Sequence, residues 1–168
     1  MRKVLLVVAP ILLFGSAAMA QSKIDTKWHC SKPSAQQKMD VGDMPDHSYA
    51  IAQGACNATS SGEGFAEKNG SYTEFQDIGK ASTSVHGHFM VTMDNGDKVH
   101  YSYIGTASAD ATKPMSNKWT IVSGTGKEKG IKGSGTCSGK AGADDSSDWT
   151  CTGTYTMGMM ASKDKMKM

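Results

Sequence analysis

Short runs of alternating apolar and polar residues, separated by Gly, Asn and Asp, limit the possible folds of this chain more than any other feature. A period of two is typical of β-strands, because successive side chains of a strand point to opposite faces. The sustained 3.6-residue period of long helices is absent, so antiparallel β structure is predicted. Seven runs are expected to form strands, namely Tyr49–Gln53, Gly70–Gln76, Val85–Met93, Val99–Thr106, Lys118–Ser123, Gly130–Cys137 and Trp149–Met157.

Seven or eight strands in one domain predict an all-β fold. The favoured architecture is a single antiparallel β-barrel of about eight strands, and a β-sandwich is the alternative. The segment Lys32–Asp46 contains Pro33, Gly42 and Pro45 together with several polar residues. We expect this segment to be a loop across the surface.

Residues 1–20 have the features of a cleavable secretion signal. Two basic residues precede the uncharged run Val4–Phe14, and an A-x-A cleavage pattern ends at Ala20. The apolar run has roughly 11 residues, whereas a membrane-spanning helix needs roughly 20. No later segment is apolar enough to span a bilayer, and no cysteine sits at the cleavage point for a lipid anchor. Export to the periplasm or the medium is therefore predicted, without stable membrane insertion after cleavage.

Removal of the signal makes the mature chain formally neutral. The full chain has 18 Lys and Arg against 16 Asp and Glu, and cleavage removes Arg2 and Lys3, which leaves 16 of each. Nucleic-acid-binding proteins need a net basic face that releases counterions, so this class is excluded. We expect one β-barrel domain over residues 21–157 and a flexible Met/Lys tail over residues 158–168.

All four cysteines lie after the signal. An even number of cysteines in an oxidising compartment predicts two disulfides, and the chain has no C-x-x-C pair that would favour a metal site. If Cys137 faces Cys151 in a hairpin, the turn centres on Asp144 in a polar loop. That register favours a Cys137–Cys151 bridge. Of the three possible connectivities, it leaves Cys30 paired with Cys56.

The turn Asp94-Asn95-Gly96 joins two of the predicted strands. A two-residue turn would pair Met93 with Lys98, whereas a three-residue turn with Gly96 in the left-handed conformation pairs Met93 with Asp97. Only the three-residue turn gives a coherent apolar face, since a slip of one residue exchanges the two faces. We therefore favour it. The apolar face then contains Val85, Gly87, Phe89, Val91, Val99, Tyr101 and Tyr103.

Three aromatic residues of this face, Phe89, Tyr101 and Tyr103, are candidate ligand contacts. The reason is that the interior of an eight-stranded barrel is either filled by side chains or holds one small ligand.

The opposite face of the same hairpin carries three histidines. In the favoured register His88 and His100 are diagonal neighbours, and Met90 lies directly across from His100. Imidazole and thioether groups suit copper or zinc. His86, His88 and His100 are therefore candidate metal ligands, and a polar outer strand face is the alternative interpretation.

A glycine-rich segment, Gly124–Thr136, lies between two predicted strands. It lacks the spacing of a phosphate-binding loop, because the required glycine before its Gly-Lys pair and the required Ser or Thr after it are absent. The segment resembles the pattern G-T-G-K-x-x-G-I-x-G-x-G-T of uncharacterised secreted bacterial proteins, in which the first x is usually Phe or Tyr. It is also similar to segments in barrels of the allene oxide cyclase and dirigent type. Glu128 departs from the pattern, which usually has an aromatic residue there.

Three N-terminal pieces also resemble segments of this bacterial group, namely Trp28–Pro33, Val41–Asp43 and His47–Gly54. The resemblance implies a barrel but no particular reaction, and it assigns no catalytic residue.

These observations favour an exported, non-enzymatic barrel that holds a small apolar ligand and needs no cofactor. A G-x-S-x-G nucleophile elbow is absent, and bridged cysteines cannot act as nucleophiles, so an enzyme is less favoured. A cyclase-like or isomerase-like enzyme on the same barrel is the first alternative, implied by the resemblance alone. A periplasmic metal-binding protein that uses the three histidines is the second.

Overall fold

The computed structural model describes residues 21–142 and 144–158. The predicted secretion signal, residues 1–20, lies outside the described residues, as do residues 159–168 of the predicted tail. Both assignments remain predictions. None of the described segments is a helix long and apolar enough to cross a membrane.

Antiparallel β-strands and one short 3₁₀ helix account for the regular structure of the described chain. The elements are β1 (Ser22–Cys30), β2 (Ala35–Asp40), β3 (Ser48–Ser61), β4 (Glu67–Ile78), β5 (Ser82–Met93), β6 (Lys98–Ser108), β7 (Met115–Gly124), η1 (Gly126–Glu128), β8 (Lys132–Ala141) and β9 (Ser147–Thr156). The predicted all-β class is confirmed.

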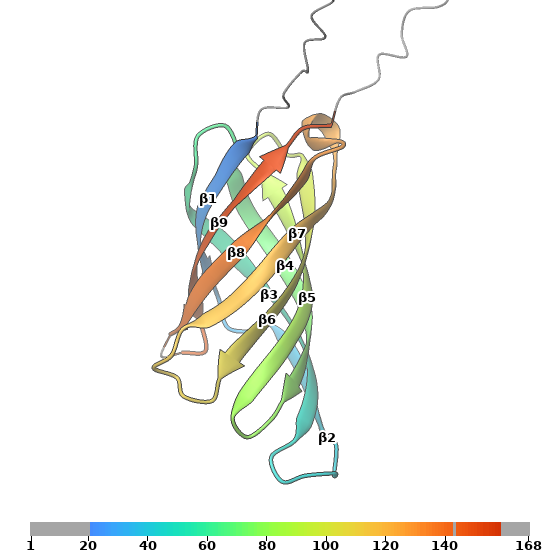
Figure 1. Cartoon of the computed structure of the whole chain (residues 1–168), viewed down its shortest axis with the longest axis vertical. Helices are drawn as coiled ribbons and strands as arrows, with labels where there is room; N and C mark the ends of the chain where they lie inside the picture. The colour runs from blue at the N-terminus through green and yellow to red at the C-terminus, as the bar shows by residue number, and fades with distance from the viewer. Residues whose placement is uncertain (1–20, 143, 159–168) are drawn as a thin grey trace, which may run out of the picture.

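Eight of the strands close into a barrel, and β2 is an additional strand outside the closure (Figure 1). From β3 to β9 each strand pairs with the next one along the chain. The first strand, β1, pairs with β9 on one side and with the C-terminal part of β3 on the other, which closes the barrel. The N-terminal part of β3 pairs with β2 instead. The predicted single antiparallel barrel is therefore confirmed, and the sandwich alternative is wrong.

The β5–β6 hairpin has the predicted three-residue turn. The backbone N–H of Met93 donates to the carbonyl of Asp97 at 2.8 Å, and Gly96 has a φ of +86°. Phe89 consequently faces Tyr101 across the ladder. Gly96 fits because a left-handed conformation has no steric cost for glycine.

The β8–β9 hairpin confirms the predicted cysteine register. Cys137 faces Cys151, and the two form a disulfide. Cys30, at the end of β1, forms the second disulfide with Cys56 in β3. The two bridges lie in neighbouring parts of the barrel wall, because β9 pairs with β1.

Two segments differ from the sequence-based expectation. Ala35–Asp40, inside the expected loop Lys32–Asp46, is the strand β2. All six of its residues are exposed, so the sequence of this strand shows no apolar alternation. Its position depends on backbone pairing with β3. The strand β1 was not predicted, although its side chains alternate strictly between exposed and buried from Lys23 to Cys30.

Part of the hydrophobic core lies at the end of the barrel next to η1, the end at the top of Figure 1. Phe65, Met93 and Ile131 are buried there, and the ring of Phe65 packs against Tyr155 with centroids 4.7 Å apart. This packing closes one end of the barrel. The candidate site reaches the opposite end.

Candidate functional site

The barrel interior contains a cavity of about 310 Å³. Its wall includes Gln76 and Thr83, on either side of the β4–β5 turn, and Ala107 and Met115, on either side of the β6–β7 turn. These turns lie at the lower end of the barrel in Figure 1, away from η1. The cavity therefore extends from these turns into the barrel, where core residues such as Ile24, Trp28 and Trp119 also line it.

Seven aromatic side chains form much of the cavity wall. They come from six different strands and are Trp28, Tyr72, Phe89, Tyr101, Tyr103, Trp119 and Trp149. Aromatic side chains provide large apolar contact areas with a polar atom at the edge of Tyr and Trp rings. The wall is accordingly suited to a compact, mainly apolar molecule.

Interior glycines make room for these rings. A Cβ atom on Gly54 would lie 2.6 Å from Cζ of Tyr72, and one on Gly139 would lie 2.5 Å from Cδ2 of Trp149. Phe89 lies over Gly70 and Tyr103 lies over Gly87 in the same manner, while Trp119 lies over Gly135 and Gly153. Because a glycine in a strand leaves space for a neighbouring ring, the barrel can hold seven aromatic residues and still enclose a cavity.

The three predicted ligand contacts, Phe89, Tyr101 and Tyr103, all line this cavity. Phe89 packs edge-to-face on Trp28 with ring centroids 5.0 Å apart, and Tyr101 packs edge-to-face on Trp119 at 5.4 Å. The structure thus places all three side chains in the barrel interior. That they contact a ligand remains a proposal.

The first polar group in the cavity wall is Glu67, which is only 6% exposed. The Thr26 hydroxyl donates to its Oε2 at 2.6 Å, and the Tyr101 hydroxyl donates to its Oε1 at 2.7 Å. Burial raises the pKa of the Glu67 carboxyl, and the two hydrogen bonds oppose that rise. Burial and the neighbouring carboxylate raise the pKa of Tyr101 well above its usual value, so the phenol remains a donor.

The second polar group is Glu74, which lies on the interior face of β4 nearer to the β4–β5 turn. The Tyr103 hydroxyl donates to its Oε2 at 2.6 Å, and Nε2 of Gln76 donates to its Oε1 at 2.7 Å. Burial, and then the charge of Glu74, raises the pKa of Tyr103 and that of Tyr72. Both phenols therefore stay protonated, and Glu74 is the acceptor of this cluster.

Sequence reasoning did not find Glu67, Glu74 or the three tryptophans as site residues. In β4 the interior positions are Gly70, Tyr72, Glu74 and Gln76, so charged and polar residues interrupt the apolar alternation. If the alternation of β5 and β6 is extended across the ladder to β4, it places Tyr72 and Glu74 on the interior face. The tryptophans required the register of β1, β7 and β9, which distant pairings determine.

Comparison with solved structures places the barrel among known folds. A pterocarpan synthase dirigent protein matches over 94% of this chain and 100% of its own chain, with 11% sequence identity and a TM-score of 0.53. The barrel shares its fold with this dirigent protein. A second pterocarpan synthase dirigent protein has 10% identity over 82% of this chain and 95% of its own, with a TM-score of 0.47. A pyocyanin demethylase has 15% identity over 79% of this chain and 99% of its own, with a TM-score of 0.39.

The first of these matches shows a shared fold and no more. The other two structures are too dissimilar to support a conclusion about this chain. No protein-family model matches the chain, and no curated protein matches it significantly. The dirigent-type part of the expected resemblance is therefore supported. The resemblance to secreted bacterial proteins through Gly124–Thr136 stays a prediction.

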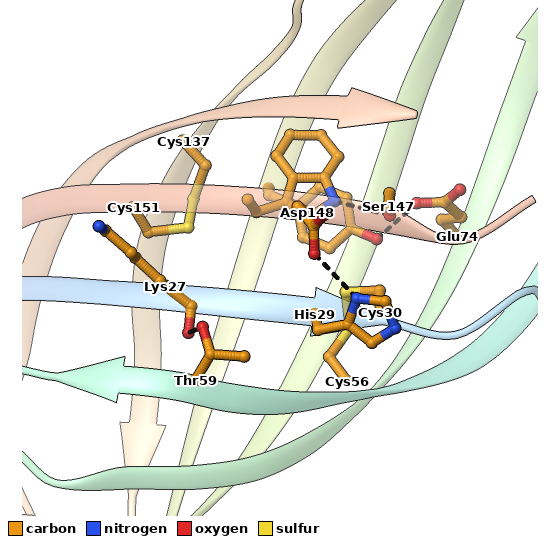
Figure 2. The surroundings of a disulfide bond; sticks show 12 residues. Lys27, His29, Cys30, Cys56, Thr59, Glu74, Cys137, Ser147, Asp148 and Cys151 are labelled. Atoms are coloured by element: carbon orange, nitrogen blue, oxygen red, sulfur yellow. Dashed lines mark hydrogen bonds and ion pairs between the residues drawn. A yellow bond between two sulfur atoms is a disulfide. The ribbon is translucent and has the colours of Figure 1, made fainter. Parts of the chain in front are cut away.

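Both disulfides line the cavity. Figure 2 shows Cys30–Cys56 bridging β1 and β3, with Cys137–Cys151 between the two neighbouring strands β8 and β9. The described residues include no free cysteine. A thiol nucleophile is thus not available in the described cavity wall.

The three candidate metal ligands lie on the outside of the barrel. His88 Nδ1 and His100 Nε2 are 3.1 Å apart, and Met90 faces His100 across the ladder, as the register predicted. His86 lies in a different row, between Phe75 and Ile104. No group of three or more His, Cys, Asp or Glu in residues 21–142 and 144–158 is arranged to hold a metal ion. Metal binding by these histidines stays a prediction.

A separate histidine, His47, links the loop before β3 to β4. Its Nδ1 lies 2.6 Å from Oδ1 of Asp43, and its Nε2 lies 3.1 Å from Oδ1 of Asp77. The hydrogen bond with Asp43, followed by that with Asp77, raises the pKa of His47 above its usual value. A group whose pKa is higher in the folded than in the unfolded state contributes its full stabilisation at pH values below the unfolded-state pKa. This contribution disappears as the pH rises through the folded-state pKa.

We therefore expect His47→Gln to lower the melting temperature more at about pH 5.5 than at about pH 8.5. Thermal unfolding of the two proteins at both pH values, followed by circular dichroism, measures the difference. Asp25→Asn, on the exposed face of β1, is a control for loss of one charged group. An equal loss at both pH values would contradict the assignment of a charged His47 in the folded state.

Proposed function

We propose that this protein is an exported, non-enzymatic barrel that binds a small, mainly apolar molecule. The observation that carries the proposal is the cavity of about 310 Å³ with seven aromatic side chains in its wall. Small-molecule pockets are typically about 300–1,000 Å³, mostly apolar, with a few polar groups that fix the orientation of the ligand. The carboxylates of Glu67 and Glu74 with their tyrosine donors are the polar groups of that kind.

Two further observations support parts of the proposal. The shared fold with a pterocarpan synthase dirigent protein is compatible with a small-molecule site inside the barrel. Two disulfides are typical of oxidising compartments, which agrees with the export predicted from residues 1–20. Export itself is checked by the intact mass of the protein recovered from the periplasm or the medium. That mass should match a chain that begins at Gln21.

A substitution that fills the cavity tests the binding proposal. Val85 lines the cavity, whereas Ser84, its neighbour in β5, lies on the exposed outer face. We expect the wild type to bind the neutral fluorophore N-phenyl-1-naphthylamine, with increased emission in the apolar cavity. Val85→Trp should lower the affinity by about tenfold or more, since the added ring occupies the space of the probe.

The matched variant Ser84→Trp adds the same side chain outside the barrel, and its affinity should equal that of the wild type. Circular dichroism confirms that both variants are folded. No binding to the folded wild type, or equal binding to Val85→Trp, would overturn the proposal.

A second candidate function is proton-transfer catalysis of the cyclase or isomerase type. The observation that favours it is the Tyr103–Glu74 hydrogen bond of 2.6 Å in the cavity wall, since a carboxylate beside a phenol can exchange a proton with a bound substrate. A bound compound recovered chemically altered from the wild type but unaltered from Glu74→Gln would support catalysis. Recovery of the same unaltered compound from both proteins would favour simple binding.

A further inference from the structure

The charged groups of the cavity are all of one sign. Among the described residues of its wall, Glu67 and Glu74 are acidic, and none is Lys, Arg or His. The remaining wall residues are uncharged. The interior of the barrel therefore holds acidic groups without a basic partner, although the mature chain as a whole has equal numbers of acidic and basic residues.

Glu74 is the acidic group with room for a further partner. Glu67 and Glu74 each accept one hydrogen bond at each oxygen, but Glu67 is almost fully buried, which leaves little space beside it for a ligand. Glu74 is less buried, and its strand neighbours across the ladders are the small residues Ala52 and Gly87. A carboxylate has about four acceptor sites, of which Tyr103 and Gln76 use two.

The tyrosines beside Glu74 do not neutralise its charge. Tyr103 donates a neutral hydrogen bond, and the pKa of both Tyr103 and Tyr72 is raised by burial and by Glu74 itself. Gln76 is an uncharged amide donor. The negative charge of Glu74 thus remains available to whatever occupies the cavity.

The aromatic rings that line the cavity together with this carboxylate favour the same kind of partner. Trp28, Tyr72, Phe89, Tyr103 and Trp149 all line the cavity. The face of an aromatic ring carries partial negative charge and attracts cations, most strongly for Trp. An aromatic wall with a carboxylate that has no basic partner combines cation–π and ionic attraction, while it repels anions such as ionised carboxylic acids at neutral pH.

We propose that the cavity selects organic cations that carry a ring, with the positive group of the ligand against Glu74. This inference rests on the proposed binding function and narrows it from a small, mainly apolar molecule to a charged class. The apolar part of such a ligand lies among the aromatic rings. The ammonium group donates to the free acceptor sites of Glu74.

Three probes with one ring system test the charge preference. They are naphthalen-2-ylmethylamine, which is a cation at neutral pH, naphthalen-2-ylmethanol, which is neutral, and naphthalene-2-carboxylate, which is an anion. Dissociation constants are measured by isothermal titration calorimetry on the full mature protein at low and at moderate salt. We expect the cation to bind the wild type most tightly, the alcohol more weakly and the anion weakest.

The variant Glu74→Gln removes the charge and keeps an amide oxygen that can accept from Tyr103. A hydrogen bond to a charged group is worth about a factor of 10 to 100 in affinity. Glu74→Gln should therefore weaken binding of the cation by about that factor and change binding of the alcohol by less than about threefold. Asp25→Asn is the matched control, because it removes a carboxylate from the exposed face of β1 without touching the cavity.

The outcomes separate the two levels of the proposal. Equal affinities of the wild type for cation and alcohol, or an unchanged cation affinity in Glu74→Gln, would overturn the cation preference and leave the binding barrel intact. An equal loss in Asp25→Asn would likewise show that net charge, and not Glu74, attracts the cation. Failure of all three probes to bind the folded wild type would overturn the binding function itself.

Discussion

Gly135→Ala is expected to destabilise the barrel by about 3 kcal/mol, the upper range for added volume in a packed interior. A Cβ atom at this position would overlap the carbonyl oxygen of Thr152 and Cζ2 of Trp119, and would lie 2.7 Å from Cα of Gly153. Two of these three atoms belong to the backbone of β9, which faces β8 across ten residue pairs. The clash therefore requires either a shift of the ladder or displacement of the buried Trp119 ring.

Urea unfolding followed by far-ultraviolet circular dichroism measures this loss as a lower midpoint at unchanged slope. The control is Gly62→Ala in the loop after β3, where a Cβ atom would approach no atom closer than the carbonyl oxygen of Asp25 at 3.4 Å. We expect Gly62→Ala to match the wild type or to exceed its stability slightly, because alanine restricts the unfolded chain. A Gly135→Ala protein as stable as Gly62→Ala would contradict the packing of Trp119 on glycine.

The β5–β6 hairpin could be predicted from the sequence because everything that determines it is local. Asp94-Asn95-Gly96 determines the turn, and the apolar alternation on both sides selects the register that places Phe89 opposite Tyr101. The same local reasoning located the Cys137–Cys151 bridge. Both results required only residues within one hairpin.

The prediction missed elements whose position depends on distant pairing or on polar residues in the interior. In β1 the interior residue Thr26 is 1% exposed and donates to Glu67, so polar residues satisfy each other inside the barrel and interrupt the apolar pattern. In β2 no residue is buried, and the strand exists because β3 is long enough to pair with both β1 and β2.

The candidate site likewise contains some residues that local sequence patterns could predict and others that they could not. Tyr101 and Tyr103 were found because their own hairpin determines which way they face. Glu74 was missed because an acidic residue in an alternating run is normally expected on the outside. The β8–β9 hairpin places Trp149 on the same face as Cys151, but only the closure of β1 with β9 and β3, which joins the two ends of the domain, makes this face the interior.

Loss of the Cys30–Cys56 disulfide is expected to be more damaging than loss of Cys137–Cys151. Loop entropy alone predicts about 3 kcal/mol or slightly more for each bridge, because the sequence separations are 26 and 14 residues and the dependence on length is logarithmic. The two bridges differ in what else holds their strands together. Cys137 and Cys151 belong to the β8–β9 hairpin, whose ladder has ten residue pairs.

Cys30–Cys56, in contrast, lies at the end of the seam that closes the barrel. The β1–β3 ladder has five residue pairs and an irregularity between Lys27 and Trp28. Beyond Cys30 the chain leaves this seam, and β2 continues along β3. Without the bridge, β1 can remain paired with β9 while it separates from β3, which opens the barrel beside the cavity.

We therefore expect Cys30→Ala/Cys56→Ala to lose about 4 kcal/mol of unfolding free energy, and Cys137→Ala/Cys151→Ala about 3 kcal/mol. Urea unfolding gives both values, and amide hydrogen exchange locates the change. Only the first variant should exchange faster at Asn57 on the seam edge of β3 and at Ser31, whose N–H donates to the Ala55 carbonyl, because the two edges of the seam then separate. It should also bind N-phenyl-1-naphthylamine more weakly, since an opened seam admits water to the aromatic wall. Equal stability losses with unchanged exchange along β3 would show that the five-pair ladder closes the barrel without help from the bridge.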